Sequence, residues 1–358
     1  MPVPYVRTRS RLPLRQSTTY NTATDTLTQR ERIMKRQSYT KHMIIYLDVI
    51  GFERTVDRSR DNPARVHKIY QMLLEAKRFV NRVGSSSQPS RPFKAQMFSD
   101  TVLLTCANPD HRSLITMTRL VSRFQARMMR HRNFIRGAAV VGDHFERGDA
   151  RFGPALIDAY KLERVAVWPR VLLHDSVMEL ATQDLAGGWW QYNLDRDEDG
   201  LTYVNYLENA FWLGTASRWR SEYEGSASAR EEHLFAAHRS AVLRGLKDPE
   251  VARDSGLLAK YHSLASYHNK TLNRLCEYLP DDFEAVRKRL HPYVHTLYQG
   301  LRLEMEKSGR DDASEFLDNR FQQLCRKKDM LRDSAVDLKE AFPGFYRRAV
   351  PDNPANPA

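Results

Sequence analysis

Short apolar runs typical of β-strands alternate with stretches of helical periodicity between residues 41 and 212, and this alternation limits the fold class more than any other feature of the chain. The first run, His42–Leu47, has the length and the β-branched and aromatic residues of a buried strand. After Pro63, apolar residues recur at a spacing of three and four, which predicts an amphipathic helix. The pattern repeats, with strands expected at 93–98, 101–106, 133–141 and 169–173 and helices expected over 114–128 and from 154 onward. We therefore predict an α+β fold in which helices flank a mostly antiparallel sheet.

The rest of the chain divides where its composition changes. Two runs, Trp189–Asn193 and Leu201–Leu207, flank the sequence DRDEDG and predict a hairpin. Beyond about Thr215 the pattern is helical and rich in charge, over 227–246, 256–279, 282–308 and 311–340. We predict four regions: a basic flexible N-terminal arm (1–40), an α+β domain (41–212), a helical C-terminal region (213–345) and a disordered tail (346–358).

More than half of the formal net charge of +12 lies in residues 1–41. Residues 1–41 contain nine Arg or Lys residues but only two acids, Asp25 and Glu31, which gives this segment a charge of +7. Its Ser/Thr runs and weak apolar periodicity indicate a flexible arm. Such an arm could contact RNA or another anionic surface, or it could be a solvated tail or lie on a partner subunit. Because charge alone indicates only non-specific attraction, direct nucleic-acid binding is the less favoured alternative.

The cysteines and the apolar runs bear on the cellular setting. Cys106, Cys276 and Cys325 lie far apart and show no CxxC spacing, so we expect reduced thiols rather than disulfides or a zinc site. No apolar run reaches the length of a bilayer span, and the N-terminus has no apolar signal core. We therefore expect a cytoplasmic protein with no membrane partner.

The acidic segment DRDEDG resembles the start of a calcium-binding EF-hand loop. Asp195, Asp197, Asp199 and Gly200 match its first positions, but the twelfth position, which requires a bidentate glutamate, is Tyr206. A hairpin turn is the better interpretation. The sequence also lacks a GxxxxGK[ST] loop, a GxSxG elbow and an HExxH helix, so the enzyme classes built on these motifs have no support.

Two aspartates at strand ends are the best candidates for chemistry. Asp48 directly follows the apolar run His42–Leu47, where a charged group is costly unless it is paired. Asp100 lies in the expected turn between two further strands. Adjacent strands would bring both carboxylates within reach of one cation, and such hard oxygen ligands suit Mg²⁺ or Mn²⁺ carrying phosphates. Because turns often contain aspartate, a purely structural role is the alternative at this point.

Four motifs, taken in order, resemble the catalytic domain of class III adenylate and guanylate cyclases: YLDVIGF, FSDTVLL, IRGAAVVG and GPALIDAYKLE. The phrases AYKLE, WPRVLL, DEDGLTYVNYL and YHSLASYHN more closely resemble the bacterial pyrimidine cyclases of the Pycsar antiphage system. The resemblance covers about residues 40–210 well and the helical remainder more loosely. It implies that the predicted domain 41–212 is a nucleotide cyclase catalytic domain.

The resemblance also implies roles for individual residues. Asp48 and Asp100 match the two metal-binding aspartates of the family, and the backbone carbonyl of Val49 matches an additional metal ligand. The Ile50-Gly51-Phe52 turn matches the loop that wraps the triphosphate. Arg136 matches a basic residue on the fourth strand and is a candidate for stabilising charge in the transition state. A surface strand residue is the plainer alternative for Arg136.

Several positions depart from the purine cyclases of this family. Those enzymes have a lysine four residues before the second metal aspartate, where this chain has Gln96. Their purine-reading aspartate becomes Ala150, or Asp149 if the alignment slips by one residue. Their transition-state asparagine and arginine fall on Ile157 and Lys161. Lys161 retains the positive charge but not the bidentate fork of arginine, and a solvated helix face is an equally open interpretation for it. These losses argue against ATP and GTP as substrates.

The implied activity is conversion of UTP to 3′,5′-cyclic UMP and pyrophosphate by two-metal catalysis with Mn²⁺ or Mg²⁺. We favour UTP over CTP only because uridylate cyclases are well represented in the family that the chain resembles. The resemblance further implies a homodimer with shared active sites and a product read by a separate effector protein in antiphage defence. The alternatives are a cytidylate cyclase and, in a different class, a catalytically silent nucleotide sensor or a basic RNA-binding protein. Because both metal-binding aspartates are present, an active enzyme is favoured over a catalytically silent protein.

Two further residues are candidates for contact with the base. Side chains alternate across a strand, so Tyr46 shares a face with Asp48 and is expected to face the same pocket. Gln96 is expected there from its place before Asp100, and its amide can both donate and accept hydrogen bonds. A bulky tyrosine would narrow the pocket and favour a one-ring base. Packing of Tyr46 in the core is the alternative.

Overall fold

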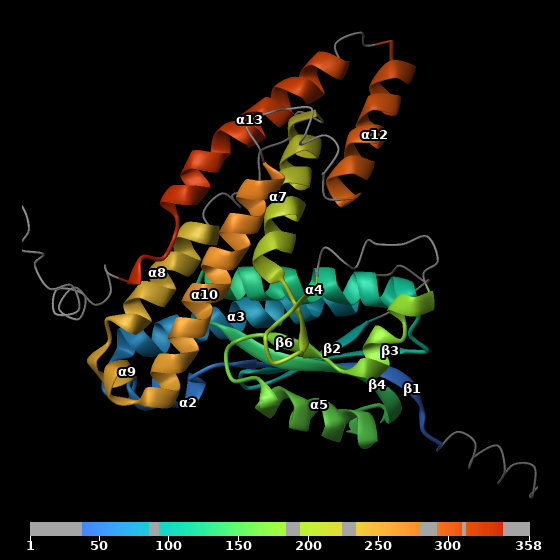
Figure 1. Cartoon of the computed structure of the whole chain (residues 1–358). Helices are drawn as coiled ribbons and strands as arrows, with labels where there is room; N and C mark the ends of the chain where they lie inside the picture. The colour runs from blue at the N-terminus through green and yellow to red at the C-terminus, as the bar shows by residue number, and fades with distance from the viewer. Residues whose placement is uncertain are drawn as a thin grey trace, which may run out of the picture.

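In the computed structural model, an eight-stranded sheet has helices on both faces, and further helices rise from one of these faces (Figure 1). The structure describes residues 38–85, 93–183, 194–223, 234–279, 292–309 and 313–338. Residues 1–37 of the basic arm, the C-terminal tail and the predicted strand Trp189–Asn193 lie outside these residues. The predicted α+β architecture with a helical C-terminal region is confirmed.

The sheet is built around one long central strand, β1 (Thr40–Val49). It pairs in antiparallel fashion with β3 (Thr101–Ala107) and with β4 (Ile135–Arg147). The strand order across the sheet is β2-β3-β1-β4-β6-β8-β7, with β5 paired to β4. Within this sheet, β4 and β6 form a parallel pair and the other pairs are antiparallel, as predicted. The shorter strands are β2 (Lys94–Phe98), β5 (Ala150–Phe152), β6 (Val171–Leu173), β7 (Leu194–Arg196) and β8 (Thr202–Val204).

The two sides of β1 are covered by different helices. Its odd-numbered residues from Met43 to Val49 are buried in a core formed with α3 (Pro63–Ser85) and α4 (His111–Met129). Its even-numbered residues face α5 (Pro154–Val165), and Ile44 packs there with Ala155 and Ala159 of that helix. Because side chains alternate along a strand, Asp48 belongs to the α5 face of the sheet. Figure 1 shows α5 on one side of the sheet and α3 and α4 on the other.

The start of α5 depends on Gly153, whose φ of 153° is outside the range that L-amino acids adopt comfortably. A Cβ at this position would lie 2.6 Å from the carbonyl oxygen of Asp143. Pro154 follows in the first turn of the helix, where its missing N–H costs no hydrogen bond. The Gly-Pro pair therefore lets α5 begin directly against β4.

The C-terminal helices share a core with the end of the sheet. They comprise α7 (Tyr206–Tyr223), α8 (Leu234–Leu246), α9 (Pro249–Arg253), α10 (Ser255–Tyr278), α12 (Pro292–Lys307) and α13 (Ala313–Asp333). One core cluster contains Leu172 and Tyr203 of the sheet together with Leu264 and Leu275 of α10. Asn209 of α7 donates a hydrogen bond of 2.6 Å to Ser122 Oγ of α4. The domain boundary predicted between residues 212 and 213 lies inside α7 and stays a prediction.

Several predicted element bounds were wrong. Strand Leu201–Leu207 ends at Val204, because the side chain of Asn205 accepts a hydrogen bond from the amide of Glu208 and opens α7. Strand β4 continues six residues past the predicted end at Val141 and pairs with β5 across a turn at Gly148, where φ is 58°. Helix α13 ends at Asp333 rather than near residue 340. The short helices α2 (Phe52–Asp57), α6 (Asp175–Met178) and α9, together with a 3₁₀ turn at Ala181–Gln183, were not predicted.

The acidic turn is part of a hairpin formed by β7 and β8, as predicted in preference to a calcium loop. The guanidinium of buried Arg170 lies 2.7 Å from Asp197 and also contacts Asp199. Trp168 donates a further hydrogen bond of 2.8 Å from Nε1 to Asp197. An internal cation therefore neutralises these two carboxylates. Separately, none of the helices in the described ranges combines the length and apolar character needed to cross a membrane.

Candidate active site

The site begins where β1 ends beside the turn between β2 and β3. Asp48 lies at the end of β1, and Asp100 lies in that turn, after Ser99 with its positive φ of 54°. Antiparallel pairing of β1 with β3 brings the two aspartates together from positions 52 residues apart. Thr101, the first residue of β3, donates a hydrogen bond of 3.4 Å from its hydroxyl to Asp48 Oδ1. The predicted meeting of the two carboxylates at neighbouring strand ends is therefore present in the structure.

Burial and a second carboxylate disfavour the charged form of Asp48. Its side chain is 22% exposed, and burial followed by the charge of Asp100 raises its pKa to about 6. The two carboxyl groups are also close enough to share a hydrogen bond. A divalent cation bound by both oxygen sets would remove this repulsion, and hard carboxylate ligands suit Mg²⁺ or Mn²⁺. The donor set thus fits the predicted metal.

Two protein carboxylates alone do not complete a metal coordination shell. Across the described ranges, no cluster of three or more His, Cys, Asp or Glu side chains is placed to hold a metal ion. Asp48 and Asp100 would need the Val49 carbonyl, substrate phosphates and water as further ligands. Mg²⁺ is commonly bound in this way, through one or two carboxylates and the phosphates of a substrate.

Arg136 links the aspartate pair to a buried glutamate. The register of the sheet places Arg136 of β4 directly opposite Asp48 of β1, and its guanidinium lies 3.6 Å from Asp48 Oδ2. Its Nε atom contacts Glu163 of α5, whose side chain is only 3% exposed. Burial raises the pKa of Glu163, and the positive charge of Arg136 opposes that rise. Arg136 is therefore held between two carboxylates in an orientation that faces Asp48.

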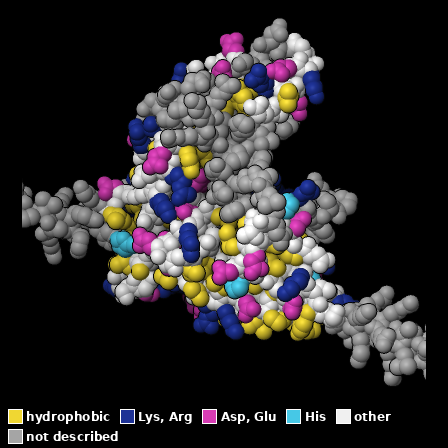
Figure 2. Space-filling model, turned by 45° about the vertical axis from the view of Figure 1, so that its right-hand side comes forward, with side chains coloured by type: hydrophobic (Ala, Val, Ile, Leu, Met, Phe, Trp, Pro, Cys, Tyr) yellow, Lys and Arg dark blue, Asp and Glu magenta, His cyan; other side chains and the backbone are white. Residues whose placement is uncertain are grey.

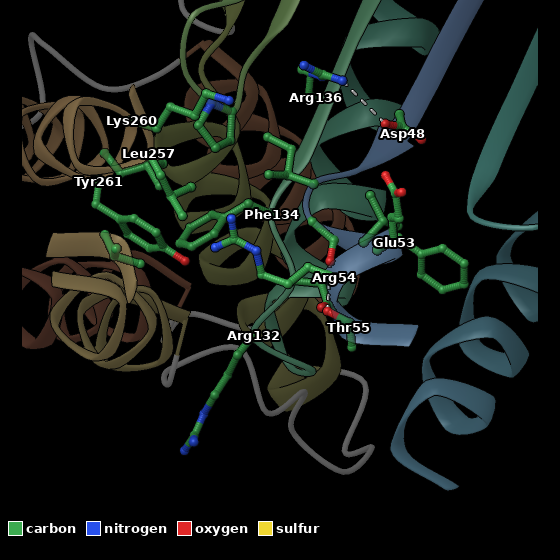
Figure 3. A pocket seen from close by; sticks show the side chains of 18 of the residues that line it. Asp48, Glu53, Arg54, Thr55, Arg132, Phe134, Arg136, Leu257, Lys260 and Tyr261 are labelled. Carbon is green, nitrogen blue, oxygen red and sulfur yellow. Dashed lines mark hydrogen bonds and ion pairs between the residues drawn. The ribbon is translucent and has the colours of Figure 1, made fainter. Parts of the chain in front are cut away.

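These residues open into a pocket of about 660 Å³ (Figure 3). Its wall is formed by the end of β1, the following turn and α2, the start of β4, and the C-terminal helices α9 and α10. The predicted residues that line it are Asp48, Val49, Ile50, Gly51, Phe52, Asp100 and Arg136. Seven of the ten residues singled out from the sequence therefore meet at one pocket.

The turn after β1 has a defined conformation. Gly51 has a φ of 72°, a left-handed value that favours glycine, and it immediately precedes α2. The amide of Ile50 donates a hydrogen bond of 3.0 Å to the carbonyl of Phe134. Thr55 donates from both its amide and its hydroxyl to the Gly51 carbonyl, at 3.0 and 2.8 Å. These contacts fix the backbone beside the two aspartates.

The three other predicted residues lie elsewhere, two of them on the α5 face of the sheet and one on α5 itself. Tyr46 is half-buried, with its ring 5.9 Å from that of Tyr160 in an edge-on arrangement, and burial raises its pKa. The side-chain amide of Gln96 contacts the guanidinium of Arg151. Lys161 is exposed on α5. None of the three is among the described residues that line the 660 Å³ pocket.

Sequence reasoning missed several residues of the site. Glu163 carried a detectable signal, because Ala155, Ala159 and Glu163 recur every four residues and form the buried face of α5. A carboxylate on such a face requires a partner. Arg54, Lys260 and Tyr261 also line the pocket, but the last two come from α10, more than 200 residues after β1. No local pattern indicates such a contact.

Comparisons with known proteins give partial structural likeness only. No protein-family model and no curated protein matches the chain. Among similar solved structures, the adenylyl cyclase CyaB from P. aeruginosa has a TM-score of 0.35 and 14% identity, covering 46% of this chain and 93% of that one. A bacterial light-regulated adenylyl cyclase gives 0.31 and 11%, with 49% and 95% covered.

A third structure is described as a class III adenylyl cyclase-like ATP-binding protein from Pseudomonas aeruginosa. It has a TM-score of 0.34 and 13% identity, and the match covers 49% of this chain and 40% of that protein. All three identities are below 15%. The function of the present chain is therefore inferred from the residues of its own pocket.

Proposed function

We propose that this chain is a nucleotidyl cyclase that converts a pyrimidine nucleoside triphosphate to its 3′,5′-cyclic monophosphate and pyrophosphate. One observation carries the proposal: the adjacent carboxyls of Asp48 and Asp100, with Arg136 beside them, line a pocket of about 660 Å³. A carboxylate pair of this kind fits the divalent metal that accompanies a triphosphate. The pocket also has the size of a small-molecule site.

The reaction is an intramolecular displacement at phosphorus. The ribose 3′-oxygen attacks the α-phosphorus, the bond to the β-phosphate oxygen breaks, pyrophosphate leaves, and the hydroxyl proton is released. Metal bound at Asp48, Asp100 and the Val49 carbonyl would lower the pKa of that hydroxyl and would neutralise negative charge on the phosphates. Arg136 is positioned to stabilise the negative charge that develops, and its contact with Glu163 holds it in place. The Ile50-Gly51-Phe52 turn would border the triphosphate.

We further propose that two copies of the chain share each active site. Lys161 is exposed and lies outside the pocket of its own chain, so a role in catalysis requires a second copy. Neighbouring apolar side chains on α5 are also exposed: Ile157 by 55%, Tyr160 by 47% and Val165 by 52%. Figure 2 shows apolar side chains along the lower margin of the molecule, where α5 lies in Figure 1. An exposed apolar helix face of this kind suits a homodimer.

Mixing two inactive variants would test the shared site. An Asp48→Ala protomer and a Lys161→Ala protomer should each be inactive alone, because each homodimer lacks one essential group in both sites. A heterodimer has one site with both groups intact, so mixing should restore up to a quarter of wild-type activity when the subunits exchange at random. Subunit exchange would be verified with two affinity tags. Full exchange with no recovery of activity would contradict the shared site or the role of Lys161.

The proposal on base specificity rests on residues that lie outside the 660 Å³ pocket of the same chain. By the resemblance, the purine-reading carboxylate position falls on Ala150, or on Asp149 if the alignment slips by one residue, and the lysine position falls on Gln96. Gln96 contacts Arg151, so the α5 face of the sheet offers an amide and a guanidinium that can hydrogen-bond a base edge. We propose UTP as the substrate and CTP as the alternative, with cyclic UMP acting as a second messenger for a separate effector in antiphage defence.

The deciding experiment is a product assay with the purified full chain. With Mn²⁺ and each of the four nucleoside triphosphates, we expect pyrophosphate release and cyclic monophosphate from UTP, to a smaller extent from CTP, and little from ATP or GTP. Efficient cyclisation of ATP would overturn the pyrimidine assignment. If none of the four is turned over, the cyclase proposal fails and the silent nucleotide sensor or basic RNA-binding protein becomes the better interpretation.

A further inference from the structure

The C-terminal helical region forms one wall of the candidate active-site pocket. Helices α9 and α10 lie against α2, and ion pairs connect the two sides. Arg54 of α2 lies 3.9 Å from Asp254, the residue before α10. Arg58, which follows α2, lies 3.6 Å from Asp248 and also contacts Glu250 of α9. The helices that follow the sheet domain are thus in contact with α2, which begins just after the turn that follows Asp48.

The cations around the pocket differ in whether an acid compensates them. Arg54 and Arg58 are paired with acids next to or within α9 and α10, and Arg136 is paired with Asp48 and Glu163. Lys260 and Arg132 also line the pocket, but neither makes a side-chain ion pair with any acid in the described ranges.

Their side chains point in different directions. Figure 3 shows Arg132 extending away from Asp48, whereas Lys260 lies on the same side of the pocket as Arg136.

Two observations place the Lys260 side chain on the Arg136 side of the pocket. Lys260 is half-buried on α10 and lines the pocket together with Asp48 and Asp100. Its positive charge acts on Glu163, which is in contact with Arg136. Because Lys260 forms no ion pair in the described ranges, its three donors require an anion or water. Within the described residues, the pocket therefore combines a carboxylate pair for a metal with a lysine that forms no ion pair.

We propose that Lys260 binds a phosphate of the metal-bound triphosphate, so that the C-terminal helical region supplies part of the substrate site within the same chain. This inference rests on the proposed function, because it takes the ligand to be a polyphosphate carried by a divalent cation at Asp48 and Asp100. A lysine ammonium is a strong phosphate ligand that acts as a point charge. The ion pair of Arg54 with Asp254 connects the start of α10 to α2, and the ion pairs of Arg58 connect α9 to the end of α2.

The binding test uses inorganic tripolyphosphate with Mn²⁺, which makes it independent of base identity and of turnover. Isothermal titration calorimetry on the full chain would compare the wild type with Lys260→Met, which keeps the aliphatic stem and removes the charge. We expect binding to weaken about tenfold, the usual scale for loss of one charge-assisted hydrogen bond. Lys260→Arg should stay within about threefold of the wild type, because it retains the cation.

The matched control is Lys270→Met, on the same helix and ten residues from Lys260, a distance of about 15 Å along the axis. It removes the same charge but should leave tripolyphosphate binding unchanged. Equal weakening in Lys260→Met and Lys270→Met would show an effect of net charge and overturn the proposal, as would unchanged binding in Lys260→Met or no binding by the wild type.

The product assay separates this inference from the proposed function. A wild type that cyclises UTP while Lys260→Met binds tripolyphosphate normally rejects the role of Lys260 alone. In another outcome the wild type turns over no nucleotide but binds tripolyphosphate, and Lys260→Met loses this binding while Lys270→Met keeps it. That result would reject the cyclase proposal and retain the polyphosphate site.

Discussion

Replacing either Asp48 or Asp100 with asparagine should reduce cyclase activity to less than a tenth of the wild-type value. A tenfold loss corresponds to about 1.4 kcal/mol of transition-state stabilisation, and loss of a metal ligand should exceed it. Asparagine keeps the shape of the side chain but removes the charge that would hold the cation. The measurement is pyrophosphate release from UTP with Mn²⁺. Asp143→Asn provides the control, because Asp143 is on the surface of β4 and pairs with Lys41 at 3.2 Å.

The same variants should separate loss of metal binding from loss of the fold. Burial and Asp100 raise the pKa of Asp48 to about 6, so at pH 8 its ionised form is less favourable in the folded chain than in the unfolded chain. Replacing Asp48 with the neutral asparagine removes this unfavourable contribution to the free energy of folding. In EDTA, Asp48→Asn should therefore melt at the same temperature as the wild type or higher. A lower melting temperature would mean that Asp48 is needed for the fold.

Adding Mn²⁺ provides a second measurement on these proteins. A ligand that binds only the folded state raises its stability by RT ln(1 + [L]/Kd), so saturating Mn²⁺ should raise the melting temperature of the wild type. Asp48→Asn should show little of this increase, and Asp143→Asn should show all of it. Residual activity above a tenth in folded Asp48→Asn, or an unaltered response to Mn²⁺, would remove Asp48 from the metal site.

Elements with a strong hydrophobic period were predicted from the sequence with small errors in their bounds. The strand expected at His42–Leu47 is β1, Thr40–Val49, and the helix expected over 114–128 is α4, His111–Met129. Both are packed between other elements, so most of their apolar side chains occupy buried positions. The spacing of apolar residues in the sequence therefore predicts these two elements well.

Short elements and contacts distant in sequence could not be predicted in this way. Helix α2 has six residues and no buried side chain, so no periodic pattern marks it. Its position depends on ion pairs with α9 and α10, which lie about 190 residues later in the chain. Lys260 is likewise an ordinary lysine in a charged helix until the packing of α10 brings it to the pocket. Tertiary contacts, rather than local propensity, determine these features.

The residues of the candidate site likewise divide into those indicated by a local sequence pattern and those placed by tertiary contacts. Asp48 and Asp100 were predicted to meet because both lie at strand ends, and adjacent strands bring such ends together. The hairpin pattern of two apolar runs and a turn predicted the position of Asp100. The choice of face for Tyr46 was also correct, since its ring packs against Tyr160 of α5, on the side of the sheet that carries Asp48. Alternation in a strand specifies a face but not a position along it. Tyr46 therefore lies on the predicted face without lining the described pocket.

Replacing Arg274 with alanine should destabilise the fold by about 3–5 kcal/mol, because it would leave a buried carboxylate without its cation. Arg274 of α10 lies 3.2 Å from Glu208 of α7 and 2.8 Å from Asp195 of β7. It thus joins the C-terminal helices to the edge of the sheet. Glu208 is only 1% exposed, and burial raises its pKa to about 7 even with Arg274 present.

The destabilisation should depend on pH with a defined sign. A carboxyl whose pKa is raised on folding costs stability as the pH rises from its unfolded value near 4.5 through its folded value near 7. Removing Arg274 raises the folded pKa of Glu208 further, because the cation no longer favours the charged form. The loss of unfolding free energy should therefore be larger at pH 8 than at pH 6, as measured by urea denaturation at both values.

Two further variants make this prediction specific to the buried pair. Lys270→Ala removes a half-exposed cation 3.3 Å from Asp195 and should cost less than about 1 kcal/mol, as exposed ion pairs usually do. Adding Glu208→Gln to Arg274→Ala removes the unpaired charge, so the double variant should recover much of the stability and lose most of the pH dependence between pH 6 and 8. A cost below about 1 kcal/mol for Arg274→Ala at pH 8, or no recovery in the double variant, would show that the Arg274–Glu208 contact does not hold the helical region against the sheet.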